Sequence, residues 1–324
     1  MLKAILGAMA GILAVEGAAS ADQWPTRPVT MVVGFAAGGT TDVLGRIVAQ
    51  RVGEVLGQPI VVENVGGAGG LTGSLRVARG PADGSQVLFG GLGTVVLNQL
   101  LYRKPPYDTV TDFAPVALVA EVPLVLLARP DLPVNTVAEF IAYAKANQTK
   151  MTFGSAGVGS APHLGCLLLN MAIGVDVTHV PFRGSGSALQ EVMAGRIDYY
   201  CDALPSALSL IQAKSLKAIA IMTRARAAVL PDLPTAQEQG LPNFEAYTWF
   251  GLFFPRATPE AIVHRLQYAT REAMNTAAVR ERLEKLGATI APLEHMAPEH
   301  LDELVRSDLR KWAAPIKASG VSVE

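Results

Sequence analysis

The stretch VTMVVGFAAGGTTDVLGRIVAQRVGEVL, residues 29–56, decides the fold class of this chain. Its first part, Val29–Phe35, is a continuous apolar run of strand length, as expected for a strand covered on both faces. Apolar residues then recur at helical spacing over Asp42–Leu56, and Gly57 supplies a helix stop. A buried strand that leads through a glycine-rich turn into an amphipathic helix is typical of an α/β protein.

The same order of strand, turn and helix recurs along most of the chain. Met151–Gly154 is predicted as a strand, Ala161–Ile173 as a helix and Val177–Phe182 as the next strand. Thr136 followed by Glu139 forms a capping box and predicts the start of another helix. Such alternation predicts parallel sheets with helices on both faces, whose ligands bind in the loops after the carboxyl ends of the strands.

Length and composition favour two lobes. Of the 324 residues, 50% are hydrophobic and 17% charged, so the chain can bury a sizeable core and is not disordered. A single core seldom grows beyond about 250–300 residues, which favours about two domains. With 27 basic and 28 acidic residues the net charge is -1. We therefore expect neither nucleic acid nor anionic lipid as a partner.

Residues 1–21, MLKAILGAMAGILAVEGAASA, have the features of a secretory signal peptide. The apolar run Ala4–Val15 follows one lysine, and Ala-Ser-Ala ends at Ala21 as a cleavage site. A membrane anchor is the alternative, but a spanning helix needs about 20 apolar residues. A later apolar stretch, VALVAEVPLVLLA, is interrupted by Glu121 and Pro123. We predict a periplasmic protein that is not embedded in the membrane.

The chain contains two cysteines, Cys166 and Cys201. Export to an oxidising compartment would permit a disulfide between them. We interpret them instead as two buried thiols that act as small apolar residues, with the disulfide as the alternative. Their spacing indicates no metal site.

Two glycine-rich loops carry the functional signal. GFAAGGTTD, residues 34–42, and FGSAGVGSAPH, residues 153–163, each lie between a predicted strand and a predicted helix. Glycine permits positive φ and close backbone approach, and the N–H groups at a helix N-terminus bind anions. Either loop alone could be a tight turn. Two similar loops, one in each half, favour an anion site built from neutral donors.

Motifs for catalysis and cofactors are missing from the sequence. Neither loop has a G-K-[ST] ending or a complete G-x-G-x-x-G, and no G-x-S-x-G or H-E-x-x-H occurs. We therefore predict no cofactor, no metal and no enzyme activity. His163 is interpreted as a residue that orients the second loop, with a catalytic base as the alternative.

Several long motifs together resemble one known family. They include VVGFAAGGTTD, PIVVENVGGAGG, DFAPVALV, FGSAGVGSAPHLG, HVPFRGSGSALQEVMAGRIDYYCD and LPDLPTAQEQGLPNFEAYTWFGLFFP. In consistent order from about Trp24 onward, they are similar to the substrate-binding proteins of tripartite tricarboxylate transporters, the Bug or TctC family.

The resemblance implies a two-lobed α/β periplasmic binding protein of the Venus flytrap type (type II). Two crossing strands would join the lobes, and the ligand cleft would lie between them. By this analogy residues 22–122 and 226–324 form lobe 1, and residues 123–225 form lobe 2.

The resemblance also implies a set of ligand-binding residues. In the family the two loops hold a carboxylate from opposite lobes, partly through ordered water. The corresponding residues of lobe 1 are Phe35, Ala37, Gly38, Gly39, Thr40, Thr41, Asp42 and Thr94. Those of lobe 2 are Ser155, Ala156, Gly157, Val158, Gly159, Ser160, His163, Arg183 and Asp202. Flanking wall positions are Leu92, Gly93, Gly184, Trp249 and Phe250.

Some positions depart from the family pattern. Gly34 replaces the usual proline, and Cys201-Asp202-Ala203 stands where Phe-Asp-Asn is common, which alters the far wall of the cleft. Arg183 replaces a usual lysine. Its guanidinium could contact a second carboxylate in a bidentate manner, or it could form a surface ion pair.

The function implied is that of a monomeric binding protein. It would capture a dicarboxylate or aromatic carboxylate without chemistry and deliver it to membrane permease subunits. One alternative is a sensor subunit that presents the carboxylate to a membrane histidine kinase. Another is a secreted hydrolase that uses Ser155 or Ser160 with His163.

Overall fold

The computed structural model describes residues 24–322, so the predicted signal peptide lies outside the described residues. The strands are β1 (Val29–Val33), β2 (Ile60–Asn64), β3 (Gln86–Gly91), β4 (Phe113–Ala128), β5 (Thr152–Ser155), β6 (Thr178–Pro181), β7 (Tyr199–Ala203), β8 (Lys217–Ile221), β9 (Tyr247–Pro255) and β10 (Thr289–Ile290). In the same residues they follow the order β2-β1-β3-β9-β4-β7-β5-β6, with β8 and β10 also paired to β4.

The helices are α1 (Thr40–Leu56), α2 (Leu71–Ala78), α3 (Asn98–Leu101), α4 (Thr109–Asp112), α5 (Val137–Asn147), α6 (Ala161–Ile173), α7 (Ser185–Met193), α8 (Leu204–Gln212), α9 (Glu260–Met274), α10 (Ala277–Glu284) and α11 (Pro298–Ser319). Short helical turns are η2 (Ala68–Gly70), η3 (Gly93–Leu97) and η4 (Leu293–His295). The capping box of Thr136 and Glu139 is confirmed at the start of α5.

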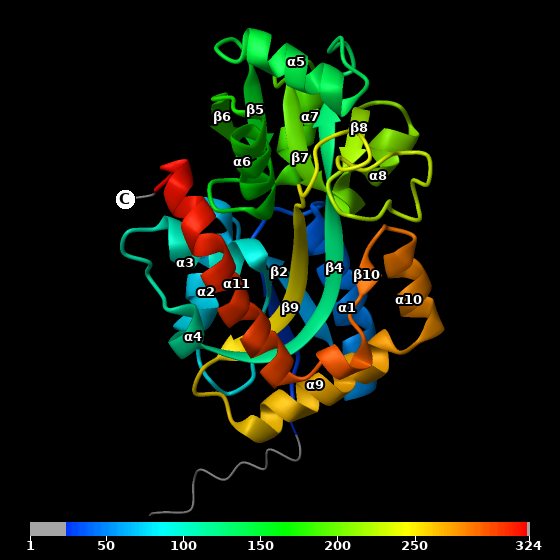
Figure 1. Ribbon diagram of the computed structural model, residues 1–324. Coiled ribbons are helices and arrows are strands. Elements are labelled where there is room, and N and C mark those ends of the chain that lie inside the picture. The colour runs from blue at the N-terminus through cyan, green and yellow to red at the C-terminus, as the bar shows by residue number, and fades with distance from the viewer. Residues whose placement is uncertain (1–23, 323–324) are drawn as a thin grey trace, which may run out of the picture.

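Two lobes lie one above the other (Figure 1). Lobe 1 holds β1, β2, β3, β10, most of β9 and the first part of β4, and lobe 2 holds β5, β6, β7, β8 and the last part of β4. β4 runs from one lobe into the other, and β9 pairs antiparallel with it from Pro255 back to Tyr247. The chain therefore crosses between the lobes on two adjacent strands, as the resemblance implied.

The sheets are mixed rather than wholly parallel. β1 is parallel to β2 and β3, and β5 is parallel to β6 and β7, as predicted. β9 is antiparallel to β3, and β4 is antiparallel to β7, β8, β9 and β10. The prediction of parallel sheets is wrong for β4 and its partners, because β4 and β9 carry the chain out of lobe 1 and back and β4 runs opposite to the strands that it joins in each lobe.

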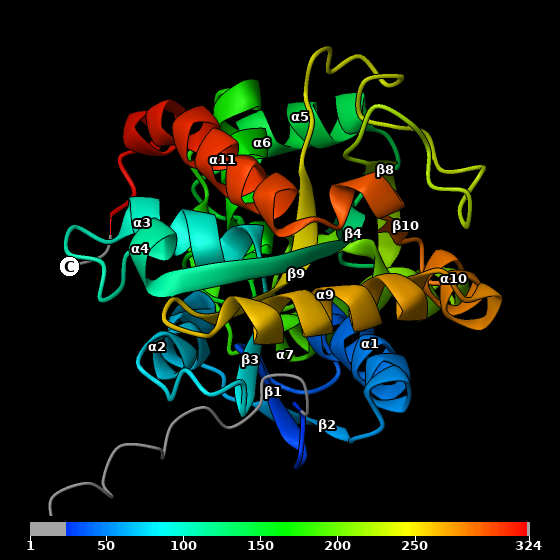
Figure 2. The same ribbon diagram turned by 90° about the horizontal axis from the view of Figure 1, so that it is seen from below.

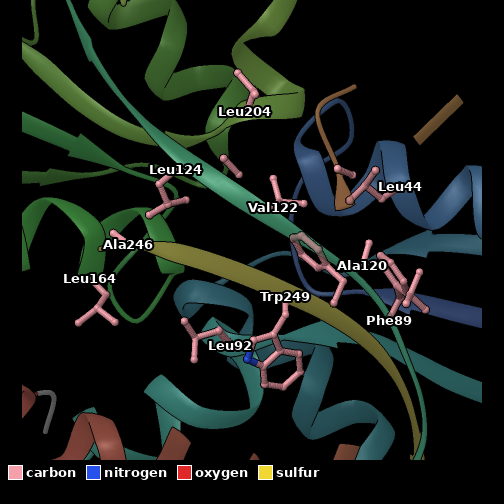
Figure 3. Close-up of a cluster of buried hydrophobic side chains, with 14 of the residues drawn as sticks. Leu44, Phe89, Leu92, Ala120, Val122, Leu124, Leu164, Leu204, Ala246 and Trp249 are labelled. Carbon is pink, nitrogen blue, oxygen red and sulfur yellow. The ribbon is translucent and has the colours of Figure 1, made fainter. Parts of the chain in front are cut away.

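A continuous apolar core surrounds the crossing strands. Leu124 and Ala246 lie near the crossing, with Leu204 and Leu164 beside them and Trp249 farther along β9 (Figure 3). From below, α9 and α11 lie along the face of lobe 1 and pack against β4 (Figure 2). Within residues 24–322, no helix has both the length and the apolar character needed to cross a membrane.

Candidate functional site

A cavity lies between the lobes, at the carboxyl ends of the strands. Lobe 1 lines it through the loop after β1 and the turn after β3, and lobe 2 lines it through the loops that begin α6, α7 and α8. The lining residues are Phe35, Gly39, Thr40, Thr41, Gly91, Gly93, Thr94, Ala156, Ala161, Pro162, Ser185, Ala203, Thr248 and Phe250. None of these carries a charged side chain, so polar contacts must come from hydroxyl groups and backbone atoms.

The first turn of α1 faces this cavity. The first N–H groups of α1, like those of any helix, lack intrahelical partners. Gly39 is the N-cap and has no side chain to cap them. Thr40 and Thr41, the first two helical residues, line the cavity. N–H groups and a positive helix end at a cavity wall favour an anionic ligand.

Asp42 holds the first loop in place. Its carboxylate accepts hydrogen bonds from the Gly38 N–H at 2.9 Å and the Asn64 side-chain amide at 2.9 Å, and it pairs with Arg46 at 2.9 Å. Burial opposes ionisation, but hydrogen bonds from Arg46, Gly38 and Asn64 hold the pKa of Asp42 below its usual value. Asp42 lies outside the cavity lining and braces the loop as a carboxylate.

The second loop has one side toward the cavity and another against lobe 1. Ala156, together with Ala161 and Pro162 at the start of α6, lines the cavity. A Cβ on Gly159 would lie 2.2 Å from the Asn98 side-chain oxygen, and one on Gly157 would lie 3.1 Å from the Gly69 nitrogen. The segment 157–159 is therefore an interlobe contact, and both glycines have positive φ.

Ser160 and His163 stabilise the second loop. The Ser160 hydroxyl caps α6 by accepting from the His163 N–H at 3.3 Å, and it donates to the Gly157 carbonyl at 2.7 Å. The His163 ring accepts the Gly159 N–H at 3.4 Å through Nδ1. Both side chains are buried and neither lines the cavity. This geometry matches the interpretation of His163 as an orienting residue.

Behind the loop, three rings form a stack. Phe153 stacks on His163 and His179, and the two histidine rings lie 4.3 Å apart between centroids. Burial lowers the pKa of His163 to about 3, with the nearby His179 adding to the effect, and burial lowers that of His179 to about 4. His179 Nε2 lies 2.7 Å from the Ser155 hydroxyl, which accepts the Gly157 N–H. Ser155 thus supports the backbone of the loop from outside the cavity.

Cys166 and Cys201 form a disulfide that joins α6 to β7, with 5.3 Å between their Cα atoms. Our interpretation of two buried thiols is wrong, because the helix and the strand pack side by side in the core of lobe 2. The bridge ties together two elements whose ends line the cavity, α6 through Ala161 and β7 through Ala203.

Arg183 lies apart from the cavity. It is exposed and lines a separate depression with Tyr102 of lobe 1 and Gly157 and Val158 of lobe 2. The ion pairs found within residues 24–322 do not include Arg183. The structure therefore places its guanidinium at the edge of the interlobe contact.

The predicted residues divide into those that line the cavity and those that support it. The lining includes Phe35, Gly39, Thr40, Thr41, Thr94 and Ala156 with the wall residues Gly93 and Phe250. The other predicted positions lie outside that lining: Ala37, Gly38, Asp42, Ser155, Gly157, Val158, Gly159, Ser160, His163, Arg183 and Asp202, with the wall positions Leu92, Gly184 and Trp249.

Some lining residues were not among the predicted ligand-binding positions. They are Gly91, Ala161, Pro162, Ser185, Ala203 and Thr248. Gly91 and Ala203 end strands, and Ala161 and Ser185 begin helices. The rule that ligands bind at the carboxyl ends of strands would have found these four, while Thr248 lies on the crossing strand β9.

Comparison with known proteins gives one consistent result. The sequence pattern described as the tripartite tricarboxylate transporter family receptor matches residues 44–321. The UPF0065 protein from the TAR-I ttuE-ttuC' intergenic region of Agrobacterium vitis is 38% identical over 299 residues, which cover 92% of this chain and 86% of that protein.

Solved structures agree with the sequence comparison. The periplasmic binding protein BugD has a TM-score of 0.89 and 36% identity, covering 93% of this chain and 100% of that one. MatC from Rhodopseudomonas palustris, solved with bound malate, has a TM-score of 0.88 and 41% identity, covering 90% of this chain and 100% of that one. Likeness at this level extends over both lobes and the crossing strands.

Proposed function

Because this chain belongs to the family of tripartite tricarboxylate transporter receptors, we propose that it binds a small organic carboxylate between its lobes. It would work in the periplasm and deliver the ligand to membrane permease subunits without changing it chemically. The malate bound by the related MatC supports a carboxylate as the ligand. We propose the lobe boundaries as residues 22–122 and 226–324 for lobe 1 and 123–225 for lobe 2.

The observation that carries this proposal is the make-up of the cavity wall. The first turn of α1 comes from lobe 1 and the first turns of α6 and α7 come from lobe 2, and all three meet at one uncharged cavity. The first N–H groups of α1 and the Ala161 N–H of α6 would bind a carboxylate, with Thr40, Thr41 and Thr94 beside them. Phe35 and Phe250 give the remaining wall an apolar surface.

Such a site couples binding to closure. A carboxylate would contact donors of both lobes only when the lobes approach each other, so the ligand stabilises the closed arrangement. The interlobe contacts at segment 157–159 and at Thr40 would form in the same step. The supporting residues, Asp42, Ser155, Ser160 and His163, would keep both loops in the shape that this step requires.

A thermal-shift screen of the mature protein tests the proposal. The panel contains linear dicarboxylates, tricarboxylates, hydroxy and amino acids, phthalates, benzoates and nicotinate. A ligand at about 100 times its Kd adds about 2.7 kcal/mol to the free energy of unfolding. We expect a selective rise in Tm of several degrees for one class of carboxylate.

A matched pair of variants locates the site. Gly39→Val places a branched side chain at the cavity wall, where the new Cβ meets Ser185 at 3.9 Å. Ala142→Val places the same side chain at an exposed position of α5, away from the cavity lining. We expect the first variant to lose the Tm response and the second to keep it. If no carboxylate raises Tm and mass spectrometry finds no acid carried through purification, the proposal is wrong.

Delivery to a permease has its own test. The purified, ligand-loaded protein should restore uptake of the bound acid by cells that carry the permease genes next to its own gene. If that neighbourhood encodes a sensor kinase instead, and uptake does not depend on the protein, the transport part of the proposal is wrong.

A further inference from the structure

Asp202 lies directly behind the wall that lobe 2 contributes to the cavity. It is the penultimate residue of β7 and is fully buried. Its neighbour Ala203 lines the cavity, and so does Ser185, whose hydroxyl lies 2.7 Å from one Asp202 oxygen. The other Asp202 oxygen lies 2.6 Å from the Ser206 hydroxyl. The carboxylate thus connects the first turns of α7 and α8.

An ionised carboxylate only accepts hydrogen bonds, so it fixes the direction of the hydroxyls around it. Ser185 donates its single hydrogen to Asp202, and the Ser206 hydrogen goes to Asp202 at 2.6 Å or to the Ala203 carbonyl at 2.9 Å. The Tyr200 hydroxyl lies 3.0 Å from the Ser185 oxygen and is also hydrogen-bonded to Asp202, so it donates to one of these two groups and leaves the Ser185 hydrogen on Asp202. Burial raises the pKa of Asp202 to about 6, against the opposing effect of hydrogen bonds from Ser206 and Ser185, so the carboxylate form prevails at neutral pH.

The same argument fixes the hydroxyl of Thr40 across the cleft. Its oxygen lies 2.9 Å from the Ser206 oxygen and 3.4 Å from the Ala203 carbonyl, and because the Ser206 hydrogen goes to Asp202 or Ala203, Thr40 donates to Ser206 or to Ala203. The Thr40 oxygen in turn accepts the Ser206 N–H at 3.2 Å. Ser185 and Thr40 both line the cavity, and both have their only hydroxyl hydrogen directed away from a ligand.

We propose that Asp202 turns this wall into an acceptor surface that selects carboxylates bearing a hydroxyl or ammonium group. The inference rests on the proposed function and adds to it the class of ligand. The carboxylate of the ligand would bind at the first N–H groups of α1 and at the Ala161 N–H of α6. Its hydroxyl or ammonium group would donate to the free lone pair of the Ser185 oxygen.

The buried negative charge strengthens this selection. A second ligand carboxylate placed against Ser185 would face lone pairs and, behind them, the charge of Asp202. An ammonium or hydroxyl group there finds both an acceptor and a favourable field. A ligand with only C–H at this position leaves the acceptor unpaired in a closed cavity, which costs affinity.

Three four-carbon dicarboxylates that differ in one substituent test the preference for a hydroxyl or ammonium group. Succinate, malate and aspartate carry hydrogen, hydroxyl and ammonium at the same carbon, and titration calorimetry at neutral pH gives their Kd values for the wild-type protein. Propionate, lactate and alanine repeat the comparison with one carboxylate. We expect a hydroxy or amino acid to bind about tenfold or more tightly than its unsubstituted partner in at least one set.

Three variants test whether the preference depends on Asp202. In Asp202→Asn the amide can donate to one serine, and the hydrogen of that serine hydroxyl becomes free to face the ligand. The ratio of the Kd values for the unsubstituted and substituted acids should therefore fall toward one. Asp308→Asn replaces another buried acid, which accepts from Trp249 in lobe 1, and should leave the preference unchanged. Ser185→Ala removes the acceptor itself and should also abolish the preference. This variant tests the proposal if Asp202→Asn does not fold.

Different results would contradict the ligand preference and the proposed carboxylate binding. Equal or higher affinity for the unsubstituted acid in both sets overturns the selection and leaves the proposed function standing, and so does binding only of panel acids that lack a hydroxyl or amino group. A preference that survives in both Asp202→Asn and Ser185→Ala also overturns it. If no acid of the wider panel binds, the proposed function falls, and this inference falls with it.

Discussion

The hydroxyl oxygen of Thr40, the first residue of α1, lies 2.9 Å from that of Ser206 in the first turn of α8. The two helices belong to different lobes, and the Ser206 N–H also donates to Thr40 at 3.2 Å. Thr40 also lines the cavity, so the proposed ligand would lie beside a contact that joins the two lobes.

Replacing Thr40 by valine tests that connection. Thr40→Val keeps the shape of the side chain but removes its hydrogen bonds to Ser206 and Ala203 across the cleft. The hydroxyl donates one hydrogen bond and accepts one, so at about 0.5–1.5 kcal/mol for each we expect ligand affinity to fall about 5- to 150-fold, as measured by calorimetry. Thr178→Val, on exposed edge strand β6, is the control and should bind normally. Equal affinities for the two variants would contradict a role in closure.

Gly159 should be essential for closure. Gly159→Ala forces alanine into a positive φ and pushes its Cβ to 2.2 Å from the Asn98 side-chain oxygen. Gly174→Ala imposes a similar φ with no atom within 4 Å. Both lose about 1–2 kcal/mol of stability from the backbone. Only Gly159→Ala should lose affinity, by about 10- to 100-fold, because its clash is with the other lobe.

Calorimetry with the best ligand of the screen measures this difference. A comparable loss of affinity in Gly174→Ala would mean that backbone strain within lobe 2, and not the contact with lobe 1, controls binding.

The disulfide should contribute measurably to stability. Cys166 and Cys201 enclose a loop with a sequence separation of 35, for which chain entropy predicts about 3–4 kcal/mol. The double variant Cys166→Ala with Cys201→Ala should therefore unfold at lower denaturant concentration. Thiol titration of the unreduced, denatured wild-type protein should detect no free thiol, and titration after reduction should detect two. Two thiols before reduction would disprove the bridge.

The buried histidines should make the fold sensitive to acid. Because the pKa values of His163 and His179 are lowered to about 3 and about 4, both rings stay neutral in the folded protein at pH values where the unfolded chain binds protons. Their contribution to stability is complete above about pH 6.5 and is lost as the pH falls toward 4. Burial raises the pKa of Asp202 to about 6, so the contribution of Asp202 to the free energy of unfolding grows as the pH falls from about 6 to 4 and partly offsets the histidines.

A single variant isolates this effect. His179→Gln keeps a donor for Ser155 but cannot titrate, so its Tm should fall less than that of the wild type between neutral pH and pH 4. His264→Gln, on the exposed face of α9, should follow the wild-type curve. Parallel curves for His179→Gln and the wild type would show that the ring stack does not govern acid sensitivity.

Local signals in the sequence predicted most of the elements. The strand and helix around the first glycine-rich loop, the capping box of α5 and the bounds of α6 all follow from apolar period, caps and glycine stops. Those signals act over a few residues and need no distant partner. The antiparallel pairing of β4 with β9 joins segments over one hundred residues apart, and no local signal specifies it.

The candidate site shows the same limit. Glycines and hydroxyls at the starts of two helices pointed to a neutral anion site, and the cavity wall contains Gly39, Thr40 and Ala156 from those loops. Which loop residues face the cavity depends on how the lobes meet. Segment 157–159 contacts the other lobe, and Ser185 enters the wall because α7 begins beside β7.

The sequence by itself therefore determined the α/β class, the two glycine-rich loops and the family resemblance, because each depends on residue types at short spacing. Only the tertiary structure decided the disulfide, the interlobe contacts and the buried chain from Tyr200 to Thr40. The physical reason is that a hydrogen bond or a bridge needs atoms within a few ångströms, and folding alone sets that distance between residues far apart in the chain.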